Sequence, residues 1–254
     1  MTAIFKREFK AYFLSPVGYI FLAIMFFFLG LQFRMIYSSG SVDVALITGQ
    51  MNSYALFLIP LITMRLLSED RHSKVDQALL TAPVPLSGII LGKFLAAFAV
   101  YALSFAPTVI FEIIAASLSS AHLGAYLYLL LGMLLFGAIL IAMGLFISSL
   151  TESTSLAAIA TLVTNIMIML MPAITSWINS SSSSITGIKI KWISNTVLAL
   201  RNALVFVLEK LTFSTPLDRF YQQIISLGDM VYFASFIAAF LFLSVRSLEK
   251  RRWA

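Results

Sequence analysis

Six long apolar runs dominate this chain, and they restrict it to folds that suit a lipid bilayer. A helix needs about 20 apolar residues to cross the hydrocarbon core of a membrane. The runs lie at roughly 17–37, 53–68, 87–118, 123–149, 155–177 and 229–247. They are continuously apolar rather than alternating, which favours helices over the strands of a membrane barrel. The sequence therefore predicts an all-α integral membrane protein with six transmembrane helices.

Charge and motif content exclude most other classes. Only 11% of the residues are charged, against about 25% in soluble domains, and the mean hydropathy is +0.97. The net charge of +6 is concentrated at the ends of the runs, where lipid headgroups explain it better than nucleic acid does. No cysteine, Walker A sequence, nucleophile motif or metal-ligand spacing occurs. We expect a non-catalytic chain that binds no metal and no cofactor.

Two of the runs depart from a simple span. The second run is short unless it extends into residues 64–67. The third run is longer than one bilayer crossing and contains Pro107, which predicts a tilt, a kink or a partial break.

Basic residues in short loops indicate the orientation, because Lys and Arg gather on the cytoplasmic side. Eleven of the 17 basic residues flank the first run, the loop between runs two and three, and the last run: Lys6, Arg7, Lys10, Arg65, Arg71, Lys74, Lys93, Arg246, Lys250, Arg251 and Arg252. The loops at 39–52 and 119–123 have none. We expect both termini in the cytoplasm, and a retained first helix rather than a cleaved signal peptide, since no small-residue cleavage motif follows it.

The first fifteen residues form an amphipathic pattern. Apolar residues, including Phe5 and Phe9, share one helical face, while Lys6, Arg7 and Lys10 lie largely on the other. This predicts a helix in the cytoplasmic membrane interface, ended by Ser15-Pro16. Two interpretations remain open: a topology anchor, or in addition a contact surface for an ATP-hydrolysing partner.

A charged island at 65–85 separates the second and third runs. It and Lys93 hold seven charged residues, and its middle, 69–80, suits a helix that Pro83 and Pro85 stop. A hydrophobic protein with one compact charged helix in a loop presents that helix to something in water. We interpret it as the place where a soluble motor protein acts on a membrane subunit.

The segment 178–228 is too apolar for a free loop, yet Arg201, Glu209 and Lys210 argue against a full span. Short re-entrant or interfacial helices on the outer side fit best, with a seventh and eighth span as the alternative.

A few polar residues inside the runs are candidates for a substrate path: Glu112, Asn165, Arg34 and Gln32. A buried acid in a span is costly and often functional. The alternatives for Glu112 are a structural partner such as Arg34, or a position at the outer surface. Asn165 suits a hydrogen bond between helices, and Gly132, Gly137 and Gly144 suit close helix approach.

The arrangement of these elements resembles the ABC-2 type transporter permeases. The loop Leu-Leu-Ser-Glu-Asp-Arg-His-Ser-Lys-Val-Asp-Gln-Ala-Leu-Leu-Thr-Ala-Pro-Val is similar to the family signature, which ends in Leu-Leu-Thr/Ser-x-Pro. Ser73-Lys74 stands where that signature has Gly-Thr. The opening Lys-Arg-Glu-Phe-Lys-Ala-Tyr-Phe-Leu-Ser-Pro-Val-Gly-Tyr-Ile and the last span resemble the gliding-motility-type (GldF-like) branch. The resemblance covers nearly the whole chain.

The resemblance implies a single ABC-2 transmembrane domain over 1–254 in the cytoplasmic membrane. A second copy or a paralogue would pair with it on a cytoplasmic ABC ATPase dimer, which would bind all ATP and Mg²⁺. The coupling helix would carry Glu69, Asp70, Arg71, His72, Lys74, Asp76, Leu79 and Leu80. ATP closure would drive export, often of amphipathic or lipid-linked cargo. A membrane-anchored auxiliary protein would contact the extracytoplasmic segment 178–228.

Two other classes remain in view. A secondary carrier would need ionisable residues near the membrane midplane, and usually internal repeats; this chain offers one off-centre acid, Glu112. A structural or signalling membrane protein without an ATPase partner is the other alternative.

Overall fold

The computed structural model describes residues 1–38, 44–73, 85–118, 123–180, 213–222 and 226–252, with 202, 205 and 224 singly. Every regular element within these residues is a helix. Among them, six stretches are long and apolar enough to cross a membrane: Pro16–Met35, Thr48–Arg71, Leu86–Ala115, Tyr126–Leu150, Thr154–Ser180 and Leu227–Lys250. The prediction of an all-α protein with six membrane helices is confirmed.

The described helices include both membrane-length and short ones. They are α1 (Thr2–Leu14), α2 (Pro16–Ser38), α3 (Val44–Thr63), α4 (Ser68–His72), α6 (Leu86–Leu103), α7 (Ala106–Leu118), α8 (Leu123–Leu150), α9 (Thr154–Ser180), α12 (Ser214–Tyr221) and α13 (Leu227–Arg252). Ser15 between α1 and α2 is extended, and Pro16 opens α2 because the first turn of a helix needs no N–H donor from it.

Helix α8 lies at the centre and packs against α3, α6, α9 and α13. Glycines on α8 make this possible. A Cβ at Gly132, Gly137 or Gly144 would overlap Phe220, Tyr101 or Thr63, respectively. The predicted close approach at these glycines is confirmed, and each one admits a different neighbouring element.

The third span is broken, as Pro107 predicts. Helix α6 ends at Leu103 and α7 begins at Ala106, because Pro107 has no N–H to donate to the preceding turn. Tighter local bonds turn the chain between the two helices: Ser104 Oγ donates to the Tyr101 carbonyl (2.6 Å), and the Phe105 N–H donates to the Ala102 carbonyl (3.1 Å).

Helix α3 begins earlier than the sequence predicts. It starts at Val44, so the interpretation of 39–52 as a loop is wrong from residue 44 onwards. Thr48 and Asn52 in this part are buried. Their polarity made the segment look like a loop, but they face the protein interior rather than lipid.

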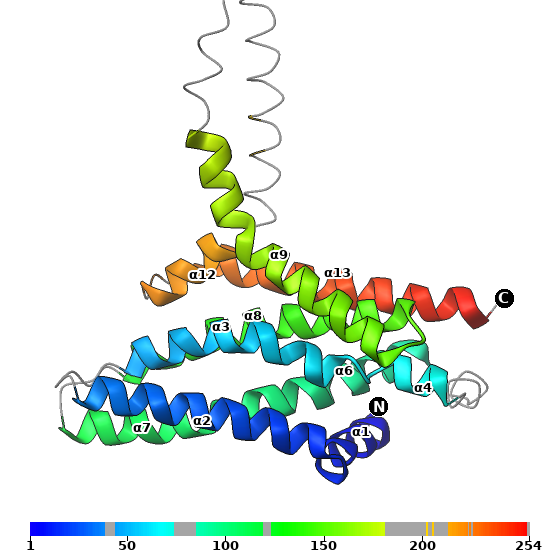
Figure 1. Ribbon diagram of the computed structural model, residues 1–254, viewed down its shortest axis with the longest axis horizontal. Helices are drawn as coiled ribbons and strands as arrows, with labels where there is room; N and C mark the ends of the chain where they lie inside the picture. Colours follow the sequence, from blue (N-terminus) through cyan, green and yellow to red (C-terminus); the bar gives the residue numbers. More distant parts are fainter. Residues whose placement is uncertain are drawn as a thin grey trace, which may run out of the picture.

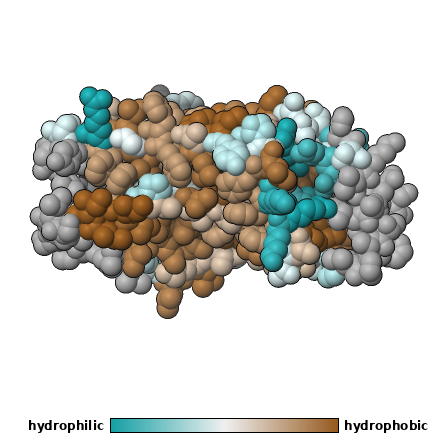
Figure 2. Space-filling model, turned by 90° about the horizontal axis from the view of Figure 1, so that it is seen from below, coloured by the Kyte–Doolittle hydropathy of each residue, from teal (hydrophilic) through white to brown (hydrophobic). Residues whose placement is uncertain are grey.

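Both termini and α4 lie at one end of the bundle, and α1 lies across that end (Figure 1). Figure 2 shows hydrophilic residues gathered in a band over α1, beside a mostly hydrophobic face. Helices α9 and α13 are the least buried candidate spans. On α9, large apolar side chains three to four residues apart are exposed: Leu156, Ile159, Val163, Met167, Leu170, Ile174 and Trp177. Lipid or another membrane helix suits such a surface better than water does.

The later part of α9 turns away from the bundle (Figure 1), and this helix contains Pro172. Of the predicted segment 178–228, the structure describes the end of α9, α12 and the start of α13; the residues between Ser180 and Phe213 lie outside the described ones, apart from 202 and 205.

Candidate functional site

The charged loop between the second and third spans begins as the short helix α4. Glu69, Asp70, Arg71 and His72 lie on it. The other residues predicted for this helix, Lys74, Asp76, Leu79 and Leu80, lie outside the described residues.

Helix α4 is anchored to the end of α8. The N–H groups of Leu67 and Ser68 both donate to Ser148 Oγ at 3.1 Å. These N–H groups lie at the start of α4, where donors have no partner within the helix. Arg71 is buried, and its Nη1 donates to the Thr151 carbonyl (3.1 Å) between α8 and α9. The base of α4 is therefore held by polar contacts rather than left free.

A buried lysine connects α4 with two other helices. Lys93 lies in the second turn of α6, and only 1% of its side chain is exposed. Its Nζ lies 3.1 Å from Glu8 Oε1 on α1 and 2.7 Å from Asp70 Oδ2 on α4. The contact with Glu8 is also a hydrogen bond, whereas the contact with Asp70 is an ion pair without hydrogen-bond alignment. Arg7 binds the same carboxylate of Glu8 from the solvent side. Two cations and two anions thus balance at this point.

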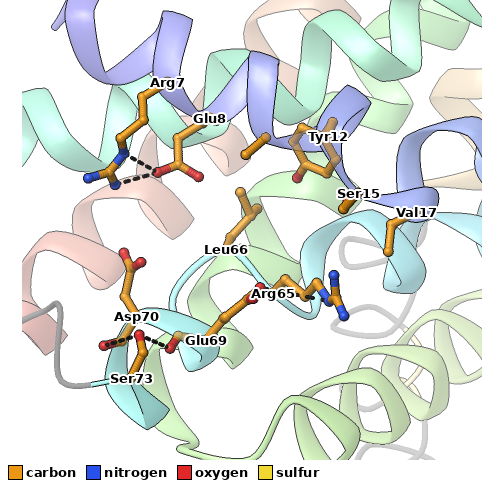
Figure 3. A pocket seen from close by; sticks show the side chains of 11 residues that line it. Arg7, Glu8, Tyr12, Ser15, Val17, Arg65, Leu66, Glu69, Asp70 and Ser73 are labelled. Carbon is orange, nitrogen blue, oxygen red and sulfur yellow. Dashed lines mark hydrogen bonds and ion pairs between the residues drawn. The ribbon is translucent and has the colours of Figure 1, made fainter.

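A cavity of about 340 Å³ lies between α1 and α4. Figure 3 shows side chains of the two helices facing each other across it. Glu8 and Tyr12 line the side of α1, and Glu69, Asp70 and Ser73 line the side of α4. Charged groups therefore surround a space that apolar side chains do not fill.

Helix α1 has the predicted amphipathic character. Phe5 and Phe9 pack against the core, while Lys6, Arg7 and Lys10 are exposed. The hydrogen bond with the Glu8 carboxylate raises the pKa of Arg7. The position of α1 in a membrane interface stays a prediction.

Tyr12 fixes α1 to the end of α3. Its hydroxyl donates to the Ile62 carbonyl at 2.6 Å, and burial raises the pKa of this phenol far above its ordinary value. The hydroxyl therefore remains a donor throughout the physiological pH range.

The candidate path residues lie in separate surroundings. Gln32 Nε2 donates to Tyr54 Oη (3.0 Å), and Arg34 is exposed near the end of α2. Glu112 is buried on α7, and the alternatives for its role stay predictions. Asn165 Nδ2 donates to the Leu56 carbonyl of α3 at 2.8 Å. The hydrogen bond between helices predicted for Asn165 is confirmed, whereas a role of these four residues in a substrate path stays a prediction.

The comparisons with known proteins identify the family. A family model described as ABC-2 family transporter protein matches residues 37–246. The chain belongs to the ABC-2 transporter family. It is thus a multi-pass membrane domain of the permease type, and such subunits are non-catalytic and work with a separate ATPase. A comparison with curated proteins finds no match.

The ABC-2 match covers α3 to α9 and most of α13, and α1 precedes it. Within the described residues, no group of three or more His, Cys, Asp or Glu could hold a metal ion.

Sequence reasoning missed Glu8, Lys93 and Ser148 as site residues of this ABC-2 permease domain. In the sequence, Lys93 indicates topology and adds to the charge of the island at 65–85, but nothing marks it as a bridge between helices. The hint was its place in the second turn of an apolar helix, Gly-Ile-Ile-Leu-Gly-Lys-Phe-Leu, where a cation needs a partner. Its partner Glu8 lies 85 positions away, so no local spacing indicates the pair.

Proposed function

We propose that this chain is the permease subunit of an ABC-2 exporter, driven by cytoplasmic ATPase subunits that act on the loop containing α4. The observation that carries the proposal is the anchoring of α4 to three places at once. Ser148 ties it to α8, Arg71 ties it to the connection between α8 and α9, and Asp70 ties it to α6 through Lys93. A displacement of α4 would therefore pass to several spans.

The two sides of α4 differ in a way that suits this role. The side chain of Glu69 is 56% exposed, and its neighbour Arg65 is 41% exposed at 3.7 Å. Arg71 is buried, and Asp70 is mostly so. Exposed charges at the rim of an interface guide association and set orientation. Helix α4 thus offers an outward charged side to a soluble partner and an inward side fixed to the bundle.

The wider arrangement follows from the family and the resemblance. A second copy or a paralogue would complete the transporter, consistent with the apolar side chains exposed on α9 and α13. The distribution of basic residues supports both termini in the cytoplasm and a place in the cytoplasmic membrane. We propose the gliding-motility-type branch, an amphipathic or lipid-linked cargo, and a membrane-anchored auxiliary protein on the outer side.

We propose that 1–254 forms a single transmembrane domain. In it, 1–15 would lie in the cytoplasmic interface, 69–80 would contact the ATPase, and 178–228 would be extracytoplasmic. The helix α1 and the short helices α4 and α12 are consistent with this division.

Co-purification tests the proposal. The chain would be produced with a candidate ABC ATPase subunit from the same genome and purified in detergent. ATP hydrolysis would then be measured with and without the permease. A stable complex with an altered hydrolysis rate is expected. A permease that purifies without the ATPase, and leaves its rate unchanged, would contradict the proposal.

A secondary carrier is the second candidate, and the burial of Glu112 inside a span favours it. A carrier of this kind would transport in vesicles on an ion gradient alone and lose that activity in Glu112→Gln. An ATP-driven exporter would depend on the ATPase instead.

A further inference from the structure

We propose that Lys93 is a positioning residue that makes α1, α4 and α6 move together when a partner displaces α4. The inference rests on the proposed function, because it concerns how a force on α4 reaches the membrane helices. It assigns a role to a residue whose sequence context indicates the end of a span and the need for a partner, but not a mechanical function.

The position of Lys93 supports a mechanical connection between α1, α4 and α6. This connection, formed by Lys93, Glu8 and Asp70, is called the joint. Its ammonium group lies between the carboxylates of Glu8 on α1 and Asp70 on α4, at 3.1 and 2.7 Å. Both carboxylates are largely shielded, with 14% and 18% of their side chains exposed. An ion pair is screened less in such surroundings than at an open surface.

Few other contacts hold α1 and α4 together. Helix α1 packs mainly against α6 and α2, whereas α4 packs against α8 and α9. The cavity of about 340 Å³ lies between them. Since an apolar core resists continuous deformation, a cavity between two elements is a place where they can shift without repacking. Lys93 then sets their relative position.

The charge balance explains why a single change would act on all three helices. Without the ammonium of Lys93, the carboxylates of Glu8 and Asp70 face each other, and Arg7 offsets the charge of Glu8 from the solvent side. A lysine that merely fills space would be replaced by methionine without effect on the distance between α1 and α4.

The test uses the natural absence of cysteine from the chain. Spin labels at Lys10→Cys on α1 and Ser73→Cys after α4 report the distance between these elements in the full chain. Lys93→Met removes the charge. The variant Glu8→Gln/Asp70→Asn/Lys93→Met removes all three charges without leaving carboxylates opposed, so it tests the joint even if the single variant does not fold. Arg246→Met is the control, since it breaks the exposed ion pair with Glu249 on α13.

We expect one narrow distance distribution in the unsubstituted background and in the Arg246→Met control, and a broader or shifted one in the triple variant. An unchanged distribution in the triple variant would overturn the inference, whether or not an ATPase binds.

A second measurement tests whether a displacement of α4 by the ATPase reaches the other helices. In the complex with the ATPase, a non-hydrolysable ATP analogue is expected to shift the distance between labels at Lys10→Cys and Lys250→Cys. At an ATPase concentration that saturates both proteins, the equilibrium between the unshifted and the shifted distance should lie about two- to thirtyfold further towards the unshifted one in the triple variant, the range for residues that carry coupling. A full shift in the triple variant would overturn the inference. Failure of the unsubstituted chain to bind any ATPase would instead refute the proposed function, and the first measurement would still judge the joint.

Discussion

At the scale of single residues, Asn165 supplies a hydrogen-bond donor that a proline removes from a neighbouring helix. Pro60 in α3 has no N–H, so the carbonyl of Leu56, four residues earlier, lacks its helical donor. The buried amide of Asn165 on α9 supplies that donor at 2.8 Å. The same bond joins α9 to the helix that leads into α4, so it serves both the backbone of α3 and the packing of α9.

Replacing Asn165 by leucine should lower stability. Asn165→Leu removes the bond and leaves the Leu56 carbonyl buried without this donor, which we expect to reduce the free energy of unfolding by about 1–2 kcal/mol. Unfolding in mixed micelles measures it. Thr164→Val is the control, because the Thr164 hydroxyl donates to Ala160 within its own helix. Equal losses in both variants would contradict the role assigned to Asn165.

Lys93 and Asn165 also show what single residues reveal before a structure is known. A polar residue inside an apolar run indicates that a partner must exist, because an unpaired polar group in a membrane is costly. The partner itself lies far away in the chain: Glu8 and Asp70 for Lys93, and a backbone carbonyl of α3 for Asn165. Only the folded arrangement identifies it.

At the scale of elements, α6 and α8 approach each other closely and share a specific contact. Tyr101 on α6 is fully buried, and its hydroxyl donates to the Met133 carbonyl of α8 at 3.0 Å. Gly137 makes room for the ring, because a Cβ at this position would overlap it.

Gly137→Ala should therefore separate α6 from α8. We expect a loss of about 1–3 kcal/mol in the free energy of unfolding, the usual effect of overpacking a tight core. Gly30→Ala on α2 is the matched control, since nothing lies within 4 Å of its Cβ, and it should be neutral or raise stability by about 0.4–1 kcal/mol. Both are measured by unfolding in the same micelles. If Gly137→Ala is as stable as the control, the close contact is not required.

The exposed side of α4 gives a second prediction for an element. Glu69→Lys changes a charge that pairs only loosely with Arg65, and exposed pairs contribute about 0–1 kcal/mol. Stability should therefore stay nearly unchanged, whereas binding of the ATPase subunit should weaken at low salt and the difference should shrink at high salt. Binding measured at two salt concentrations tests this. Glu249→Lys, which alters an exposed pair at the same end of the bundle, should have no such effect.

The sequence predicted those helices well whose length and composition are set by the need to cross a lipid bilayer. Continuous apolar length gave the six spans, and the missing N–H of Pro107 gave the break between α6 and α7. The start of α3 was not predicted, because Thr48 and Asn52 look like loop residues until the helices that bury them are known. The joint at Lys93 was not predicted either, since it depends on three elements meeting at one end of the bundle.

At the scale of the whole molecule, the positions of the two termini and of α4 indicate how the protein is oriented in the membrane. Figure 1 shows both termini and α4 together, with α1 across the same end. Three regions rich in basic residues therefore meet at one end of the bundle, although they are far apart in the sequence. An even number of spans places both termini on the same side of the membrane. The connection between the second and third spans, which carries α4, lies on that side as well.

This arrangement predicts which positions a reagent can reach from each side of the membrane. Single cysteines in the cysteine-free chain at Lys6, Ser73 and Lys250 should react with a membrane-impermeant maleimide only from the cytoplasmic side, because basic residues stay there during insertion. Cysteines at Ser38 and Gly124, at the ends of α2 and α8, should react only from the opposite side. Right-side-out and inverted vesicles give the two measurements, and full reaction in detergent shows that each site is accessible. Reaction of Ser73→Cys and Ser38→Cys from the same side would contradict the six-span topology. Reaction of Ser73→Cys from the outer side alone would reverse the orientation, and α4 could then not meet a cytoplasmic ATPase.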